Sequence, residues 1–234
     1  VEKPITLNKK DAIELNEIAK KNNVNLMVGH LLLFHPAFKA IKKMLDAGDI
    51  GDLQYIYSNR LNHGKIRTKE NVFWSFAPHD IALFQYFFNE SPIEISSSGV
   101  DILQPGIHDT TITSFKYKNN KMGHIFVSWL HPFKEHRFVI IGSKGMIHFE
   151  DSKDNKPLLF YNKSVKFDGK IPIAGSGESK KISYEFEFPL EKELQYFINH
   201  LDGSEIKIAS GESAIEVMDI LEKSSFDLIK KRAH

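Results

Sequence analysis

Consecutive strand-like segments joined by tight turns constrain the fold of this 234-residue chain more than any other feature. Through its middle, hydrophobic and polar residues alternate, which is the pattern of strands with one buried face. Two polar segments, Lys118-Asn119-Asn120-Lys121 and Gly142-Ser143-Lys144-Gly145, have the composition of hairpin turns. Because hairpins join antiparallel neighbours, the sequence predicts a mostly antiparallel sheet.

The predicted strands cluster together rather than alternating with helices. We expect strands over residues 53–62, 93–100, 110–117, 123–130, 137–141, 146–150, 158–161 and 182–188, and a Gly/Ser/Lys-rich loop over 169–181. Apolar residues at helical spacing predict helices over about 8–22, 36–47, 75–89, 190–201 and 212–231. This arrangement favours an α+β fold, with helices on one face of an open sheet.

The first 29 residues have a different pattern. The helix that begins near Asn8 is followed by a short β-rich run, Val24 to Val28, which ends at Gly29-His30. A helix followed by a short apolar strand is the unit from which α/β sheets are built. One such pair cannot form a doubly wound sheet. We therefore divide the chain into residues 1–29 and residues 30–234.

Composition excludes several classes of function. Lys plus Arg number 31 and Asp plus Glu number 30, so no excess positive charge would attract nucleic acid or an anionic membrane. No run approaches the roughly 18 apolar residues of a membrane span, and no secretory signal is recognisable. The absence of cysteine excludes disulfides and thiol nucleophiles, and it suits a reducing compartment. We expect a soluble, cytoplasmic protein without nucleic-acid or membrane partners.

Lys3 and His79 are the strongest candidates for chemistry. Lys3 precedes Pro4 at the end of a would-be parallel strand, where α/β sheets present ligands. His79 lies near the start of an apolar helix, and its spacing from Ser75 predicts that both side chains share one face. An imidazole can take a proton from an alcohol near pH 7. A charged connector at Lys3, and a His79 bonded to the backbone beside a capping Asp80, are the alternatives.

Further polar residues follow the first long predicted strand. Arg60, Asn62 and Arg67 would suit an anionic substrate, because guanidinium groups match phosphate and carboxylate. An ordinary exposed strand edge and loop is the alternative. The chain has 11 histidines, but none forms the i, i+4 pair of a metallohydrolase helix, so we expect no metal site.

Five motifs occur in the order found in one enzyme family. They are Glu2-Lys3-Pro4, Val28-Gly29-His30 with Phe34-His35-Pro36, Trp74 to Asp80, Gln104 to Asp109, and Val127 to Pro132. The chain thus resembles Gfo/Idh/MocA oxidoreductases, and most closely their nucleotide-sugar 3-dehydrogenase branch. The resemblance implies that residues 1–29 are the last helix and strand of a Rossmann dinucleotide-binding domain. It implies that residues 30–234 form a substrate-binding domain whose open sheet makes a homo-oligomer.

The resemblance also implies an activity. It is the NAD- or NADP-dependent oxidation of a secondary hydroxyl of a sugar, at C3 of a UDP-linked amino sugar or its uronate. Lys3 and His79 would flank that hydroxyl, with His79 accepting its proton and Lys3 stabilising the developing negative charge. The substrate residues implied are His30, Arg60, Asn62, Arg67 and Asp80, and the cofactor residues are Glu2, Lys3 and Pro4. Ser75 stands where many members have an aspartate.

One family feature is missing. No glycine fingerprint of a dinucleotide-binding turn, with its downstream acidic residue, occurs in the chain. We therefore expect a fragment that holds the cofactor poorly and is inactive alone. Two alternatives remain open: a non-enzymatic binding or assembly module that retains the family fold, and a dehydrogenase of inositol or a simple hexose.

Overall fold

A computed structural model describes residues 1–232, which fold around one eight-stranded sheet. Its order is β10-β7-β6-β5-β1-β4-β3-β2. The strands are β1 (Leu53–His63), β2 (Glu94–Val100), β3 (Thr110–Lys116), β4 (Met122–Ser128), β5 (Leu130–Gly142), β6 (Met146–Glu150), β7 (Leu158–Tyr161) and β10 (Ser179–Lys181). Only β1 and β4 pair in parallel, and every other neighbouring pair in this sheet is antiparallel. The predicted α+β fold is confirmed.

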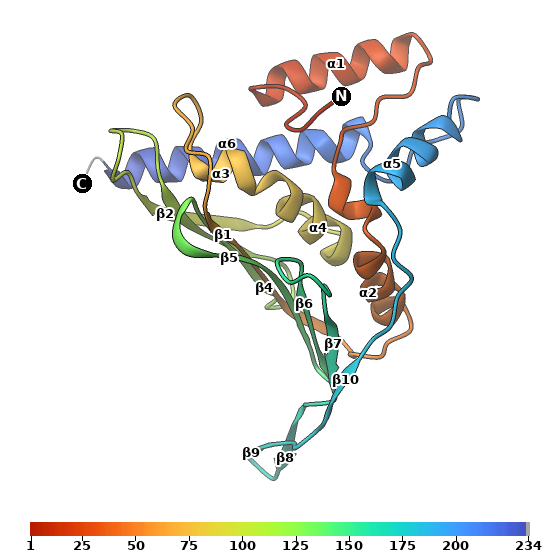
Figure 1. The fold of residues 1–234 in the computed structure, drawn as a ribbon, viewed down its shortest axis with the longest axis vertical. Coiled ribbons are helices and arrows are strands. Elements are labelled where there is room, and N and C mark those ends of the chain that lie inside the picture. The colour runs from red at the N-terminus through yellow and green to blue at the C-terminus, as the bar shows by residue number, and fades with distance from the viewer. Residues whose placement is uncertain (233–234) are drawn as a thin grey trace.

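The helices gather on one side of this sheet, while the opposite side carries none of the described helices (Figure 1). They are α1 (Lys9–Lys21), α2 (Pro36–Asp46), α3 (Val72–Phe76), α4 (Pro78–Phe88), α5 (Pro189–Ile198) and α6 (Gly211–Arg232), with a short 3₁₀ helix η1 (Leu31–Phe34). The long helix α6 packs against α1, α4 and β2. None of the helices formed by residues 1–232 is long and apolar enough to cross a membrane.

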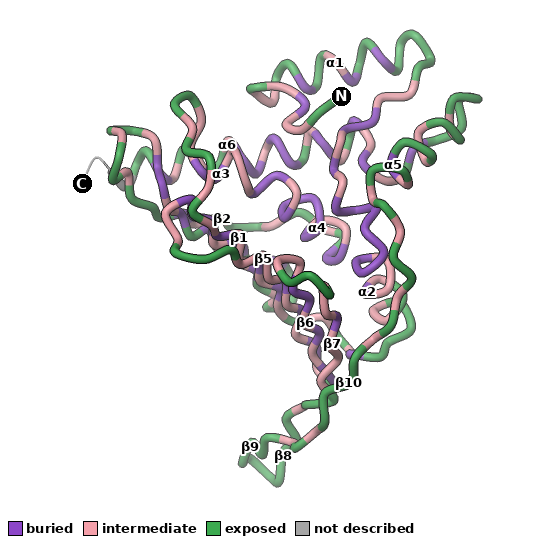
Figure 2. The backbone as a smooth tube through the Cα atoms, viewed as in Figure 1, coloured by how far each residue is buried: buried purple, intermediate pink, exposed green. Residues whose placement is uncertain are grey.

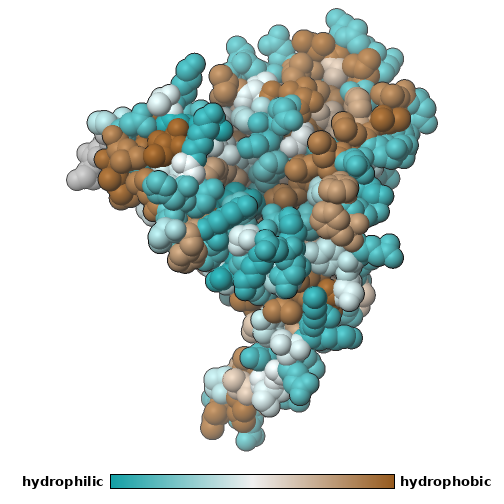
Figure 3. Space-filling view, in the orientation of Figure 1, coloured by the Kyte–Doolittle hydropathy of each residue, from teal (hydrophilic) through white to brown (hydrophobic). Residues whose placement is uncertain are grey.

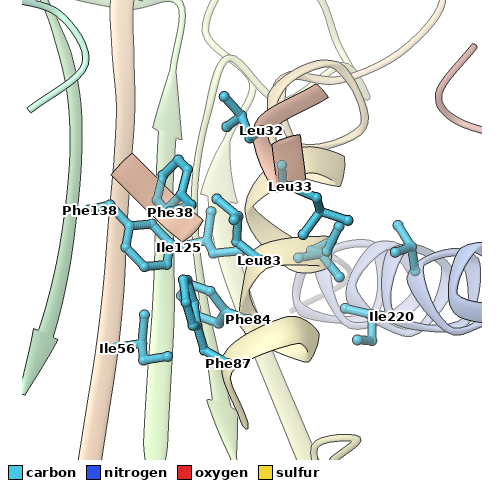
Figure 4. Packing of buried hydrophobic residues seen from close by; sticks show 14 of the residues in the cluster. Leu32, Leu33, Phe38, Ile56, Leu83, Phe84, Phe87, Ile125, Phe138 and Ile220 are labelled. Atoms are coloured by element: carbon cyan, nitrogen blue, oxygen red, sulfur yellow. The ribbon is translucent and has the colours of Figure 1, made fainter. Parts of the chain in front are cut away.

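The core lies between the sheet and these helices (Figure 4). Phe38 of α2 meets Phe138 of β5 and Phe149 of β6 edge to face, with ring centroids 5.1 and 5.2 Å apart. Phe84 of α4 contacts Phe138 in the same way at 5.8 Å. Since strand side chains alternate between the two faces, every second residue of the central strands contributes to this layer. The layer therefore fixes α4 firmly over β1.

The helix-free face of the sheet is lined by aromatic and aliphatic side chains. Tyr57 of β1 stacks on His124 of β4, with centroids 5.2 Å apart and an interplanar angle of 2°. Tyr55 bonds the Nδ1 atom of the same histidine. A depression of about 360 Å³ on this face is lined by Tyr57, Val139, Met146 and Tyr161, among others.

A two-stranded hairpin projects beyond the β10 edge of the sheet (Figures 1 and 2). It consists of β8 (Val165–Asp168) and β9 (Ile171–Ala174), which pair only with each other. Phe167 and Ile171 are 70% and 66% exposed, and Figure 3 shows hydrophobic side chains at the tip. The prediction of a loop over 169–181 is therefore wrong, since the segment contains β9 and β10 (Ser179–Lys181). Gly169, with φ of +60°, makes the tight turn that allows this pairing.

The single helix predicted over 75–89 is also wrong. Two helices form instead, α3 and α4, and they meet at Ala77. Pro78 explains the break because it has no N–H with which to continue α3, whereas the first position of a new helix requires no such donor. Asn71 caps α3 through the Trp74 N–H at 3.1 Å. As predicted, α4 ends at Asn89, which adopts the left-handed conformation.

Two predicted strands do not form. The run from Val24 to Val28 makes only a single bridge, between Met27 and Ser210, because too few of its residues face a continuous partner strand. The segment 182–188 is irregular, although Ile182 donates one backbone bond to Leu158 at 2.8 Å. In this region the sheet gains β10 from residues that the sequence assigned to the loop.

Candidate active site

The fold brings Lys3 to the junction of α3 and α4. The Lys3 Nζ donates to the backbone carbonyl of Ser75 at 2.9 Å. His79 is the second residue of α4 and lies within electrostatic range of Lys3. Ser75 belongs to α3 and His79 to α4, so the single helix on which the prediction of a shared face rested does not form. The Ser75 main chain, rather than its hydroxyl, makes the contact with Lys3.

His30 is the third member of this cluster. It lies just before η1, and its ring approaches that of His79 edge to face, with centroids 6.1 Å apart. His30 is only 2% exposed. Three segments that are distant in the sequence therefore meet here: the N-terminal segment, the entry to η1 and the first turn of α4.

The electrostatics of the cluster keep both imidazoles neutral. Burial lowers the pKa of His79 well below its usual value of 6.5, and the charges of Arg60 and Lys3 act in the same direction. Burial and Lys3 lower the pKa of His30 to about 4. Burial also lowers the pKa of Lys3, and Arg60 adds to this effect. At neutral pH the two histidines can accept a hydrogen bond or a proton.

Several hydrogen-bonding atoms in this region are buried without a partner among the described residues. They include Nδ1 of His30, Nδ1 of His79 and Oδ1 of Asn62. Asn62 lies near the end of β1, two residues after Arg60. Since most buried polar atoms in proteins are hydrogen-bonded, such a group of unsatisfied atoms is typical of a site for a polar ligand.

Arg60 and Asp80 bind each other. The Arg60 Nε lies 2.8 Å from Oδ2 of Asp80, and Nη2 lies 3.0 Å from Oδ1. The Ser58 hydroxyl also donates to Oδ1 of Asp80, at 2.7 Å. Asp80 is 1% exposed. The structure thus places both predicted substrate residues beside His79, but it commits their charged groups to one another.

Arg67 lies in the loop that follows β1 and keeps part of its side chain in solvent. Its Nε is 3.5 Å from Oε1 of Glu70, and the Arg67 side chain is 42% exposed. The backbone carbonyl of Arg67 accepts a bond from the Gln104 side chain at 3.0 Å. This contact ties the loop after β1 to the loop between β2 and β3. Of the two predicted arginines, Arg67 is the more accessible to a ligand.

Two residues near this cluster were not predicted from the sequence as part of the site. Glu193 of α5 is 6% exposed, and burial together with the charge of Glu2 raises the pKa of Glu193 to about 7. His136 of β5 lies 3.5 Å from Nη1 of Arg60. The sequence did not predict that His136 lies beside Arg60, because one histidine in a long strand does not reveal which charged residue it will face. The register that pairs His136 with Arg60 supplies that information.

No group of three or more His, Asp or Glu residues converges in a metal-binding arrangement within the part of the chain that the structure describes. The chemistry available at the cluster is therefore that of two neutral imidazoles, one ammonium group and one accessible guanidinium group.

Comparison with known proteins identifies the fold. Residues 38–148 match the GFO/IDH/MocA C-terminal domain. An uncharacterized oxidoreductase of Streptococcus pneumoniae is 23% identical over an alignment of 258 positions, gaps included, and the alignment covers 93% of this chain and 70% of that protein. The scyllo-inositol 2-dehydrogenase (NAD(+)) of Bacillus subtilis is 25% identical over an alignment of 179 positions, and the alignment covers 72% of this chain and 52% of that enzyme.

A solved structure has the same fold over nearly the whole chain. The UDP-N-acetylglucosamine 3-dehydrogenase from Acidithiobacillus ferrooxidans superimposes with a TM-score of 0.82 at 20% identity. The superposition covers 97% of this chain and 70% of that structure.

Proposed function

We propose, on the premise that this chain belongs to the Gfo/Idh/MocA family of oxidoreductases, that it forms the substrate side of a sugar dehydrogenase site. The reaction we assign to it is the oxidation of a secondary hydroxyl of a sugar. One observation carries this proposal: Lys3 and His79, 76 positions apart in the sequence, lie together with His30, and the Nδ1 atoms of both histidines are buried without a partner among the described residues.

His79 and Lys3 have complementary roles in this proposal. Neutral His79 accepts the proton of the substrate hydroxyl, which requires the oxygen within hydrogen-bond reach of the ring. The Lys3 ammonium group, held by the Ser75 carbonyl, stabilises the negative charge that develops on the same oxygen. His30 provides a neutral neighbour that contacts the His79 ring and excludes water from one side of it.

The family implies NAD or NADP, and the described residues fit only its reacting end. At α1, the helix that follows the Glu2-Lys3-Pro4 segment, Asn8 already acts as the cap by accepting from the Asp11 N–H at 2.8 Å, and no glycine turn precedes it among the described residues. We therefore assign no pyrophosphate contact to this chain. Glu2, Lys3 and Pro4 remain our proposal for the cofactor side of the site, where a bound nicotinamide would supply the hydride acceptor.

A nucleotide sugar is the substrate class that we favour, at C3 of a UDP-linked amino sugar or its uronate. Arg67 supports this choice because it offers an accessible guanidinium group at the rim, which suits a phosphate or a carboxylate. Asn62, with an unsatisfied carbonyl oxygen, fits a sugar hydroxyl or amide N–H. Inositol or a simple hexose is the competing substrate, and a binding module without activity is the competing function.

We also propose a homo-oligomer formed through the helix-free face of the sheet. Its support is the row of aromatic and aliphatic side chains on that face, including Tyr57 and Val139. The division at residue 29 and the cytoplasmic location stay predictions. On this view residues 30–234 supply both the substrate contacts and the contacts between subunits.

Calorimetric titration of the purified chain tests the substrate class. We expect UDP-N-acetylglucosamine to bind, and myo-inositol to bind much more weakly. Replacement of Arg67 by Gln should weaken binding of the UDP-sugar about tenfold, because a hydrogen bond to a charged group contributes roughly 1.5 kcal/mol or more. Lys163→Gln, a change on the other side of the sheet, is the control. Preferential binding of myo-inositol would favour the competing substrate, and no binding of any sugar would favour the non-enzymatic module.

A further inference from the structure

The Arg60–Asp80 ion pair has no room to contact a substrate. Besides its bonds to Asp80, Arg60 points its remaining Nη1 towards His136 at 3.5 Å. The Arg60 side chain is 15% exposed and that of Asp80 is 1% exposed. The cavity bordered by these two residues, Phe38, Phe138 and Phe149 measures about 10 Å³. A space of this size holds at most one water molecule, so a sugar ring cannot enter it.

A gain in folding stability alone does not explain a buried ion pair such as Arg60–Asp80. Removing two charges from water costs several kcal/mol for each ion, and apolar residues of similar volume often serve equally well. Phe38, Phe138 and Phe149 lie beside this pair, together with polar groups such as Ser58, His136 and Asp151. A role in the neighbouring site is a better explanation.

The pair is connected directly to His79. Asp80 is the next residue of α4, and its carboxylate takes three hydrogen bonds from Ser58 and Arg60 of β1. These bonds hold the first turn of α4 against the sheet, at the point where Pro78 starts the helix. A rigid first turn fixes the direction of the His79 side chain, which leaves the same turn.

The pair also contributes charge. The groups that act on the His79 ring are the Arg60 guanidinium from β1, the Lys3 ammonium from the N-terminal segment and the His30 imidazole from before η1. The Asp80 carboxylate contacts the Arg60 guanidinium, so its negative charge offsets part of the positive charge that acts on His79. Both members of the pair therefore affect the His79 ring. The positive charge of Arg60 lowers its pKa, and the negative charge of Asp80 acts in the opposite direction.

We propose that the Arg60–Asp80 ion pair is a positioning element that orients His79 and sets how strongly its imidazole holds a proton. This inference rests on the proposed function for its purpose, since His79 is the base of that reaction. It assigns Arg60 and Asp80 to the support of the base rather than to contact with the sugar.

The test measures the titration of His79 by NMR in the free chain, so that it needs neither substrate nor turnover. Arg60→Gln leaves the Asp80 charge uncompensated, and we expect it to raise the His79 midpoint by about one pH unit. Asp80→Asn leaves the Arg60 charge uncompensated, and we expect a lower midpoint. A purely structural role would loosen the first turn of α4 in both variants and move both midpoints in the same direction.

Two further variants keep the result interpretable. The double variant, which combines Arg60→Gln with Asp80→Asn, can retain an amide hydrogen bond without buried charge, so it guards against unfolding of the single variants. We expect its midpoint to lie between theirs. Arg137→Gln, on the neighbouring strand and bonded to Glu150 instead, should leave His79 unchanged.

Midpoints that move together, or that do not move, would overturn the proposal even if the chain binds sugars. Midpoints that move apart in a chain that binds no sugar would support the ion-pair inference and contradict the proposed function.

Discussion

At the scale of the residue, buried histidines carry much of the pH sensitivity of this protein. His30, His35 and His136 are buried or nearly so, and burial lowers the pKa of each to about 4. The unfolded chain would hold these protons near the ordinary value of 6.5. Between those two values the unfolded state binds more protons than the folded state, so stability falls as the pH is lowered.

His35 allows this effect to be isolated. Its Nδ1 accepts from the Ala37 N–H at 3.2 Å and caps α2, so the ring is neutral in the fold. Its contribution is fully present above pH 6.5 and is lost as the pH falls towards 4, which amounts to roughly 3 kcal/mol. Asparagine is also a good N-cap but does not titrate.

We therefore expect His35→Asn to flatten the loss of unfolding free energy between pH 6.5 and 4. Urea denaturation at a series of pH values measures this. An equally steep loss in the variant would show that His35 does not contribute, whereas His63→Asn, which changes a histidine at the exposed end of β1, should keep the steep loss.

Some residues of the candidate site could be recognised from the sequence, whereas the contacts between them could not. Lys3 and His79 were recognised from short motifs, because each motif is local. Their proximity was not predictable, because it depends on how the N-terminal segment packs at the junction of α3 and α4, where Lys3 bonds the Ser75 carbonyl. Arg60 was predicted as an anion ligand from its chemistry alone. Only the packing of α4 on β1 shows that Asp80 occupies its guanidinium group.

At the scale of the element, strands with regular alternation were predicted closely and irregular ones were not. Observed β6 and β7 have the predicted bounds, and β2 and β3 differ by a residue at one end. The strand β5 begins seven residues earlier than expected, at Leu130, because pairing with β1 extends it through a polar segment. The hairpin β8–β9 was hidden by a composition that is typical of loops.

The helix-free face of the sheet supports a prediction at this scale. Ile112 of β3 lies opposite Phe126 of β4 on that face and is 48% exposed. If copies of the chain associate through this face, Ile112→Asp places a charge in the interface and should convert the oligomer to the monomer. Light scattering coupled to size-exclusion chromatography measures the mass.

Phe226→Asp is the matched control for this experiment. Phe226 belongs to α6 and is 71% exposed, so a charge there lies away from the helix-free face. An unchanged mass for Ile112→Asp, or dissociation by Phe226→Asp alone, would contradict an interface on the sheet.

At the scale of the whole molecule, the sheet and its single helical layer bring together residues from distant parts of the chain. Lys3 comes from the N-terminal segment, His30 from the residue before η1, Arg60 from β1 and His79 from α4. This fold is shared with a UDP-N-acetylglucosamine 3-dehydrogenase at a TM-score of 0.82. The shared fold alone does not determine the substrate, which depends on the side chains of the site.

If Lys3 and His79 act on one sugar hydroxyl, their contributions to sugar affinity are coupled, and a double-mutant cycle measures that coupling. The affinity of UDP-N-acetylglucosamine is measured by calorimetry for the wild-type chain, Lys3→Met, His79→Gln and the double variant. We predict that each single change weakens binding about tenfold and that the double change weakens it much less than a hundredfold, since both residues bond one oxygen. Strictly additive losses, or no loss from either change, would contradict the claim.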